Sequence, residues 1–185
     1  MVEWTSFEAD DEKLAELILY VAERSESDPD FGATKINKIL FYSDFTAFAR
    51  HGKPITGQEY MRLENGPVPR RFIPVFAILE QAKRAAIKHC PVAGGFVQHR
   101  TIALEPPHLT RFTAEEIAIV DEVIDDLRGY NARRVSEVSH RFIGWQVARE
   151  RETIPYEMVY LSTRPVTDEE LAYARQLAQH YGNEA

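Results

Sequence analysis

The sequence predicts a predominantly α-helical fold of the α+β class, a single compact domain of about six helices with a small β element. Most apolar residues recur at the three- and four-residue spacing of a helix. Two Thr-x-x-Glu patterns mark helix starts, and two short β-prone segments interrupt the helical pattern. A chain of 185 residues with 44% apolar content can build its own core, and no linker composition divides it. We therefore expect one domain over residues 1–185.

The first two helices are predicted from caps and apolar stripes. Asp10 and Asp11 are candidate N-caps before an apolar stripe that should end near Arg24. Thr34 is expected to cap a second helix, and Gly52 to end it, because glycine favours the position after a helix C-terminus. The loop between the two helices contains proline and glycine.

The middle of the chain alternates between strand, turn and helix signals. Residues 58–63 alternate as a short strand, and residues 65–67, Asn-Gly-Pro, predict a turn. A third helix is expected over 70–88, beginning close to Pro74, because proline is tolerated in the first turn. Residues 96–104 predict a second strand, which we expect to join 58–63 in one small sheet.

The last part of the sequence is again helical. Thr113 begins a capping-box pattern, and the helix that follows should end at Gly129. A fifth helix is expected over 132–141, and Trp145 belongs to or flanks a short one. Thr167 begins a second capping-box pattern and predicts a last helix with its own apolar stripe.

Charge and composition restrict the class of partner and the compartment. The net charge is −7, but residues 1–32 carry −8, residues 33–100 carry +7 and residues 101–185 carry −6. An acidic protein is repelled by phosphate backbones at long range, so nucleic acid is an unlikely partner, and the basic segment is expected to neutralise acids across the fold. Cys90 is the one cysteine, which suits a reducing, cytoplasmic location. The longest apolar runs fall far short of the roughly 20 residues of a membrane helix, and the acidic N-terminus does not resemble a signal peptide.

Enzyme motifs are missing from the sequence. It contains no Gly-rich phosphate loop, His-Glu-x-x-His or Cys-x-x-Cys. His89 and Cys90 are chain neighbours, which rarely orient toward each other as base and nucleophile. Ser139 and His140 are also neighbours, about 100° apart on a helix, so they cannot form a dyad. We expect no catalytic residue.

Metal and cofactor sites are not expected either. Asp121 and Asp125 stand one helical turn apart, but no further ligand lies at a diagnostic spacing. His99 and His108 are too loose a pair to specify zinc, which takes four ligands. We therefore predict no metal and no cofactor.

Two segments have patterns that point to more than an ordinary core helix or a surface loop. Residues 35–42, Lys-Ile-Asn-Lys-Ile-Leu-Phe-Tyr, place Lys35 and Lys38 one turn apart beside large apolar residues. Residues 65–69, Asn-Gly-Pro-Val-Pro, form a stiff turn directly before Arg70. An ordinary amphipathic helix and a purely structural turn would also explain these patterns.

Together these segments resemble the Panacea domain, also called the SocA-like antitoxin domain, of bacterial and phage toxin–antitoxin systems. Residues 35–42 are similar to the family's Lys-Leu-x-Lys-Leu-x-Tyr helix, and 52–55 to the turn that follows it. Residues 66–69 match its Gly-Pro-Val turn. Residues 127–145, with His140 five positions before Trp145, resemble its C-terminal Ser/Thr-His helix and tryptophan. The resemblance covers roughly residues 34–155.

The resemblance implies a non-enzymatic antitoxin that neutralises a cognate toxin by direct binding, or that acts as an adaptor handing the toxin to a cellular protease. The residues expected to bind the partner are Lys35, Lys38, Tyr42, Gly66, Pro67, Val68 and Arg70. His140 and Trp145 are expected to be structural, with partner contact as the alternative. We also expect the helix with the two lysines and the Gly66 turn to lie close in space.

Two other classes of function stay open at this point. A DNA-binding or phage-associated regulator would need the +7 segment gathered on one face, but the connection over 52–69 is far longer than that of a helix-turn-helix. A small enzyme would have to use Cys90 or a histidine. The sequence does not specify the toxin or the oligomeric state.

Overall fold

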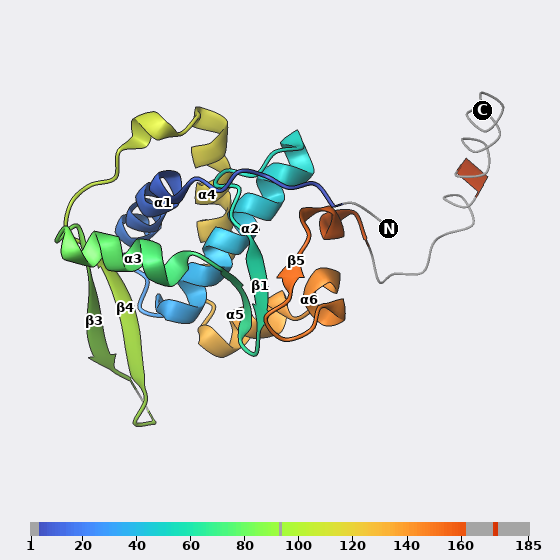
Figure 1. Ribbon diagram of the computed structural model, residues 1–185. Helices are drawn as coiled ribbons and strands as arrows, with labels where there is room; N and C mark the ends of the chain where they lie inside the picture. Colours follow the sequence, from blue (N-terminus) through green and yellow to red (C-terminus); the bar gives the residue numbers. More distant parts are fainter. Residues whose placement is uncertain (1–3, 93, 162–171, 174–185) are drawn as a thin grey trace.

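The computed structural model describes residues 4–92, 94–161 and 172–173, and within them six α-helices surround or flank two small antiparallel sheets (Figure 1). The α-helices are α1 (Asp11–Arg24), α2 (Ala33–His51), α3 (Phe72–Gln81), α4 (Ala114–Asp126), α5 (Ala132–Ser139) and α6 (Ile143–Val147). The strands are β1 (Tyr60–Leu63), β2 (Gly66–Pro69), β3 (Ala85–Pro91), β4 (Val97–Ala103) and β5 (Thr153–Ile154), and η1 (Leu109–Arg111) and η2 (Tyr156–Tyr160) are 3-10 helices. The predicted class, α+β with helices dominating, is confirmed.

Helix α2 crosses the middle of the molecule and packs against α1, α4 and α5 as well as strand β2 (Figure 1). It is buried nearly all round, with Ile36, Leu40 and Phe41 fully enclosed in the core. A helix that is covered on every side can carry polar residues only where a neighbour satisfies them. The polar side chains of α2 therefore mark the places where other elements are fastened to it.

Asp44 is one such place. It is completely buried in α2, where it accepts hydrogen bonds from the Thr56 backbone N–H at 2.7 Å, from the Thr56 hydroxyl and from the Tyr60 hydroxyl at 2.8 Å. Burial raises the pKa of this carboxyl, while the same hydrogen bonds act to lower it. The contacts fix the start of β1 against α2.

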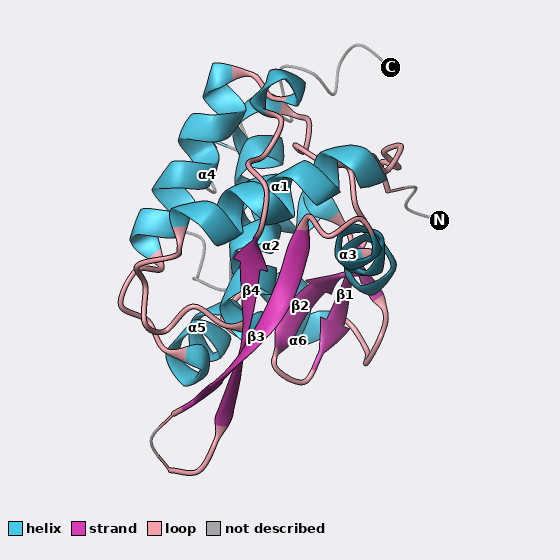
Figure 2. Cartoon of the chain, turned by 90° about the vertical axis from the view of Figure 1, so that its left-hand side faces the viewer, coloured by secondary structure: helices cyan, strands magenta, loops and turns pink. Residues whose placement is uncertain are grey.

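The strands form two separate sheets, so the predicted single sheet of 58–63 with 96–104 is wrong. One sheet has the order β2-β1-β5, and the other pairs β3 with β4. β4 pairs with residues 85–91, the segment directly before it in the chain. A hairpin of neighbouring segments closes a short loop, so its entropy cost is small. The base of the β3–β4 hairpin packs against α1 and α3, and its turn end projects beyond the helices (Figure 2).

The predicted helix over 70–88 is correct only in its first part. α3 ends at Gln81, and Lys83 adopts a left-handed conformation with φ of 57°. Arg84 then turns back to pair with Glu16 of α1 at 2.7 Å. Residues 82–88 have good helix propensity, but this ion pair and the pairing with β4 place most of them in a strand, where tertiary context overrides propensity.

The helix ends mostly follow the sequence signals. Asp10 caps α1 by accepting from the Lys13 N–H at 2.8 Å, Gly52 ends α2 with φ of 71°, and Thr113 forms the expected capping box. Thr34 is not the cap of α2, because the helix begins at Ala33 after Gly32. The helix expected from Thr167 lies outside the described residues. None of the described helices has the length and apolar character needed to cross a membrane.

Candidate functional site

The residues that carry the sequence motifs meet at the β1–β2 hairpin. Three side chains from three helices each donate a hydrogen bond to an alternate backbone carbonyl of the hairpin. Lys38 of α2 donates to Pro67 at 3.1 Å, Ser136 of α5 donates to Asn65 at 3.1 Å, and Trp145 of α6 donates to Leu63 at 3.0 Å. We call these three contacts the hairpin clamp. The expected proximity of the lysine helix and the Gly66 turn is observed.

Gly66 is the point of closest approach inside the hairpin clamp. Its φ is +102°, and a Cβ at this position would lie within 3.0 Å of Ser139 Oγ, Lys38 Cε and Lys38 Nζ. Only glycine adopts this backbone conformation without strain and leaves room for both side chains. The turn itself is at residues 64–65, because Gly66 and Pro67 belong to β2, which corrects the predicted turn at 65–67.

Both lysines of the α2 motif are buried rather than solvated, each with 1% exposure. Lys35 forms an ion pair with Asp28 at 2.7 Å, which fastens the α1–α2 loop to α2. Lys38 has no acidic partner among the described residues, and its ammonium donates a hydrogen bond to the Pro67 carbonyl. Burial lowers the pKa of Lys38 to about 7, because removal from water disfavours the ammonium form.

Tyr42, His140 and Trp145 lie at the border of the core. Tyr42 is half-buried against the core, its ring edge-on to Phe41, and burial raises its pKa to about 12. The His140 and Trp145 rings stack with their centroids 3.8 Å apart. Burial is the main cause that lowers the pKa of His140, and the positive charge of Lys38 adds to it. Arg62 covers the Trp145 ring at 4.4 Å.

Trp145→Phe is expected to lower the free energy of unfolding by about 1–2 kcal/mol, because the ring stack is kept but the Leu63 carbonyl loses its donor. Urea denaturation of both proteins measures the difference. Val147→Ala, which truncates an exposed apolar side chain on the same helix, is the control. Equal stability of Trp145→Phe and the unchanged protein would show that the indole N–H does not hold the hairpin.

The three-stranded sheet has an inner and an outer face. Tyr60 points into the core, where its hydroxyl, which donates to Asp44, also lies 2.9 Å from the Leu40 carbonyl oxygen. Because side chains alternate along a strand, Met61 and its cross-strand neighbours Val68 and Thr153 point the other way. All three are half-exposed, and Arg70 lies beside them with its guanidinium 2.8 Å from Thr153 Oγ1. We call Met61, Val68, Thr153 and Arg70 the outer sheet face.

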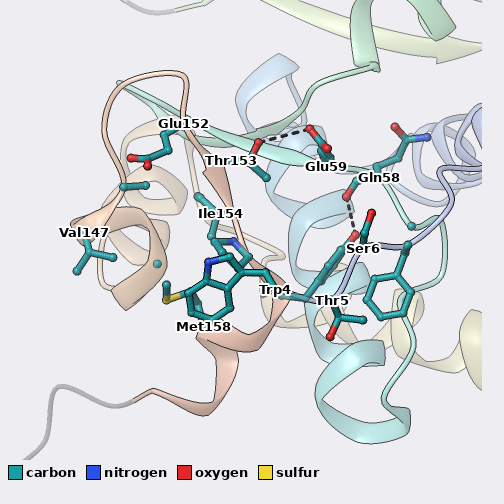
Figure 3. Close-up of a pocket in the computed structure, with 16 residues that line it drawn as sticks. Trp4, Thr5, Ser6, Gln58, Glu59, Val147, Glu152, Thr153, Ile154 and Met158 are labelled. Atoms are coloured by element: carbon teal, nitrogen blue, oxygen red, sulfur yellow. Dashed lines mark hydrogen bonds between the residues drawn. The ribbon is translucent and has the colours of Figure 1, made fainter. Parts of the chain in front are cut away.

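An apolar groove of about 560 Å³ adjoins this face at β5 (Figure 3). Trp4, Ile154 and Met158 gather on one side of it, and Thr153 and Glu59 border the other, joined by a 3.4 Å hydrogen bond. Trp4 and Val147 are 47% and 59% exposed. Large exposed apolar side chains around a groove are typical of protein-binding surfaces.

Basic residues of the middle segment pair with acids from the other two segments. Such pairs are Arg50–Glu122, Arg62–Glu150, Arg71–Asp11 and Arg84–Glu16. This pairing supports the interpretation that the +7 segment neutralises acids across the fold, and it leaves less free charge for a phosphate backbone.

The residues considered for catalysis are dispersed. Ser139 Oγ donates its proton to the Ser136 carbonyl at 2.9 Å, and a carbonyl is not a base that could activate it as a nucleophile. Cys90 lies on β3 opposite Gln98, and His89 packs against His99 across the hairpin at 4.7 Å. No group of three or more His, Cys, Asp or Glu side chains suited to a metal ion occurs in the described part of the chain.

Comparison with known proteins identifies a family for the chain. The family model described as "Antitoxin SocA-like, Panacea domain" matches residues 36–146, more than half of the chain and all three parts of the hairpin clamp. Searches of curated proteins and of solved structures gave no match. The family supports an antitoxin role in general, with a toxin as the kind of partner, and its domain is not typically enzymatic. The chain therefore belongs to the SocA-like antitoxin family with the Panacea domain.

Proposed function

We propose that the chain neutralises a cognate toxin by binding it directly through the outer sheet face and the adjoining apolar groove. The observation that carries this proposal is the hairpin clamp, which holds a short hairpin rigidly against three helices while Val68 and Met61 remain half-exposed on its other side. A pre-organised surface loses little conformational entropy on binding. Apolar and arginine side chains on such a surface favour a protein partner.

The predicted partner-binding residues then divide into two groups. Val68 and Arg70 contact the toxin, since both lie on the outer sheet face. Lys35 and Tyr42 do not contact the toxin. Lys35 holds the α1–α2 loop through Asp28, and Tyr42 packs α2 against the core. Gly66 and Pro67 shape the hairpin, Lys38 of α2 and Trp145 of α6 hold it, and His140 at the end of α5 stacks on Trp145.

Co-expression with the toxin encoded beside this chain tests the proposal. Val68→Asp places a charge on the outer sheet face and is expected to abolish growth rescue, because burial of an unpaired carboxylate in an interface is costly. Val97→Asp is the matched control, an exposed valine in β4 on the other sheet. Both variants must melt like the unchanged protein. Full rescue by Val68→Asp would show that the toxin binds elsewhere.

The same experiment separates direct occlusion from delivery to a protease. Occlusion leaves the amount of toxin in the cell unchanged, and the purified pair forms a stable complex. Delivery lowers the amount of toxin, and rescue then fails in cells that lack the protease. We propose occlusion, because the surface described above is a binding surface and needs no second protein.

A further inference from the structure

A cavity of about 360 Å³ opens between α2 and the β1–β2 hairpin, on the side of the hairpin clamp that faces solvent. Its lining comes from the first two turns of α2, from the β1–β2 hairpin as far as Val68, and from Glu150 in the loop after α6. The polar residues among its lining are Thr34, Asn37, Lys38, Glu64, Asn65 and Glu150. The cavity therefore brings a buried cationic side chain to a solvent-accessible hollow.

The ammonium of Lys38 is incompletely satisfied at this cavity. It has three N–H donors, and the Pro67 carbonyl at 3.1 Å is the acceptor found for them. The side chain is 1% exposed, and no carboxylate among the described residues lies within ion-pair distance. A buried charge without a counter-ion is costly, so an anionic oxygen entering the cavity would recover a large part of this cost.

Asn37 adds a second unsatisfied group to the same lining. Its Nδ2 donates to the Ala33 carbonyl at 2.7 Å, but its Oδ1 is buried and receives no hydrogen bond from the residues that the structure describes. The amide side chain is 9% exposed. The cavity thus offers N–H donors from Lys38 and one acceptor from Asn37, a pair that complements a ligand with an anionic oxygen next to an N–H group.

We infer that this cavity receives an acidic side chain of the protein partner, whose carboxylate pairs with Lys38 and whose backbone N–H donates to Asn37. This inference rests on the proposed function, because it assigns a contact to the same partner. Glu64 is exposed at the mouth, and Glu150 is paired with Arg62 at 3.0 Å. These carboxylates disfavour a dianion such as phosphate more strongly than a single carboxylate within a neutral peptide.

Titration of the lysines by NMR tests the inference without the toxin. The probe is N-acetylglutamate methylamide at tens of millimolar, added to protein with ¹³C-labelled lysine. The Lys38 pKa of about 7 is expected to rise by about one unit, a tenfold gain in proton affinity, because a bound carboxylate favours the ammonium. Exposed Lys53 should not respond, and the matched uncharged probe, N-acetylglutamine methylamide, should leave Lys38 unchanged.

Three results would overturn the inference. They are no shift of Lys38 with the glutamate probe, an equal shift with the glutamine probe, and a shift with inorganic phosphate at least as large, which would identify a site for small anions instead. Glu64→Gln removes a carboxylate at the mouth that has no ion pair within the described part of the chain, and it is expected to increase the shift with the glutamate probe.

Binding to the toxin separates this inference from the proposed function. Lys38→Met is expected to weaken the complex at least tenfold, since it leaves the partner carboxylate buried and unpaired. If the unchanged protein binds the toxin and Lys38→Met binds it equally well, the cavity inference is wrong and the proposed function stands. If the unchanged protein does not bind the toxin, the proposed function is wrong. Should Lys38→Met fail to fold, the titration of the unchanged protein decides.

Discussion

Gly66→Ala is expected to lower the free energy of unfolding by about 3–5 kcal/mol, because the added methyl group meets packed side chains in a backbone conformation that disfavours a side chain. The added Cβ would come within 3.0 Å of Ser139 Oγ, Lys38 Cε and Lys38 Nζ, so the hairpin clamp has to open. The positive φ of 102° adds about 1–2 kcal/mol of backbone strain for a residue with a side chain.

Urea denaturation followed by circular dichroism measures this loss, and Gly129→Ala is its matched control. Gly129 also has a positive φ, of 76°, but nothing lies within 4 Å of its Cβ position. Gly129→Ala should therefore cost only the backbone strain, about 1–2 kcal/mol. If the two variants lose equal stability, the packing around Gly66 is looser than the structure shows.

The second large effect is a dependence of stability on pH that comes from Lys38. Its pKa is about 7 in the folded protein and 10.5 in the unfolded chain, so between these values the unfolded state binds the extra proton. The free energy of unfolding is highest, with respect to this residue, above pH 10.5, where Lys38 is neutral in both states. It decreases as the pH falls toward 7, because only the unfolded chain then gains the proton. Between pH 7 and pH 9, the free energy of unfolding should rise by about 2 kcal/mol on account of this residue.

Urea denaturation at pH 7, 8 and 9 compares the unchanged protein with Lys38→Met and Lys53→Met. Lys38→Met should lack the rise, because methionine does not titrate. Lys53→Met should retain it, since Lys53 is exposed. The same rise in all three proteins would contradict the assignment, because the proton would then bind elsewhere.

The fold class and most helix ends could be predicted from sequence because they depend on local chemistry. A capping side chain such as Asp10 or Thr113, or a glycine after a helix such as Gly52, acts within one turn. The strand over 85–91 could not be predicted, because its first residues have good helix propensity and the turn that ends α3 before it is held by Arg84 meeting Glu16, 68 residues away in the chain. The pairing of β1 with β5 depends on an even more distant segment.

The candidate site was predictable in part. The motif residues Lys38, Gly66 and Trp145 do meet, but the sequence gives no measure of burial, so Lys38 was placed among surface residues. Ser136 of the hairpin clamp and Met61 of the outer sheet face carried no sequence signal. Ser136 has an unremarkable position on a helix, and Met61 is distinguished only by its alternation with Tyr60.

The edge of β2 has a consequence for the free antitoxin. The carbonyl of Pro67 points away from β1 toward Lys38, so the backbone groups of Pro67 and, by alternation, Pro69 face the outer edge of the strand. Neither proline has an N–H, and one of the two carbonyls is already bonded. A further strand, from a second copy or from an unfolded chain, therefore meets no row of free N–H and C=O groups with which it could pair. An antitoxin produced in excess over its toxin is thus protected at this edge from strand-mediated aggregation.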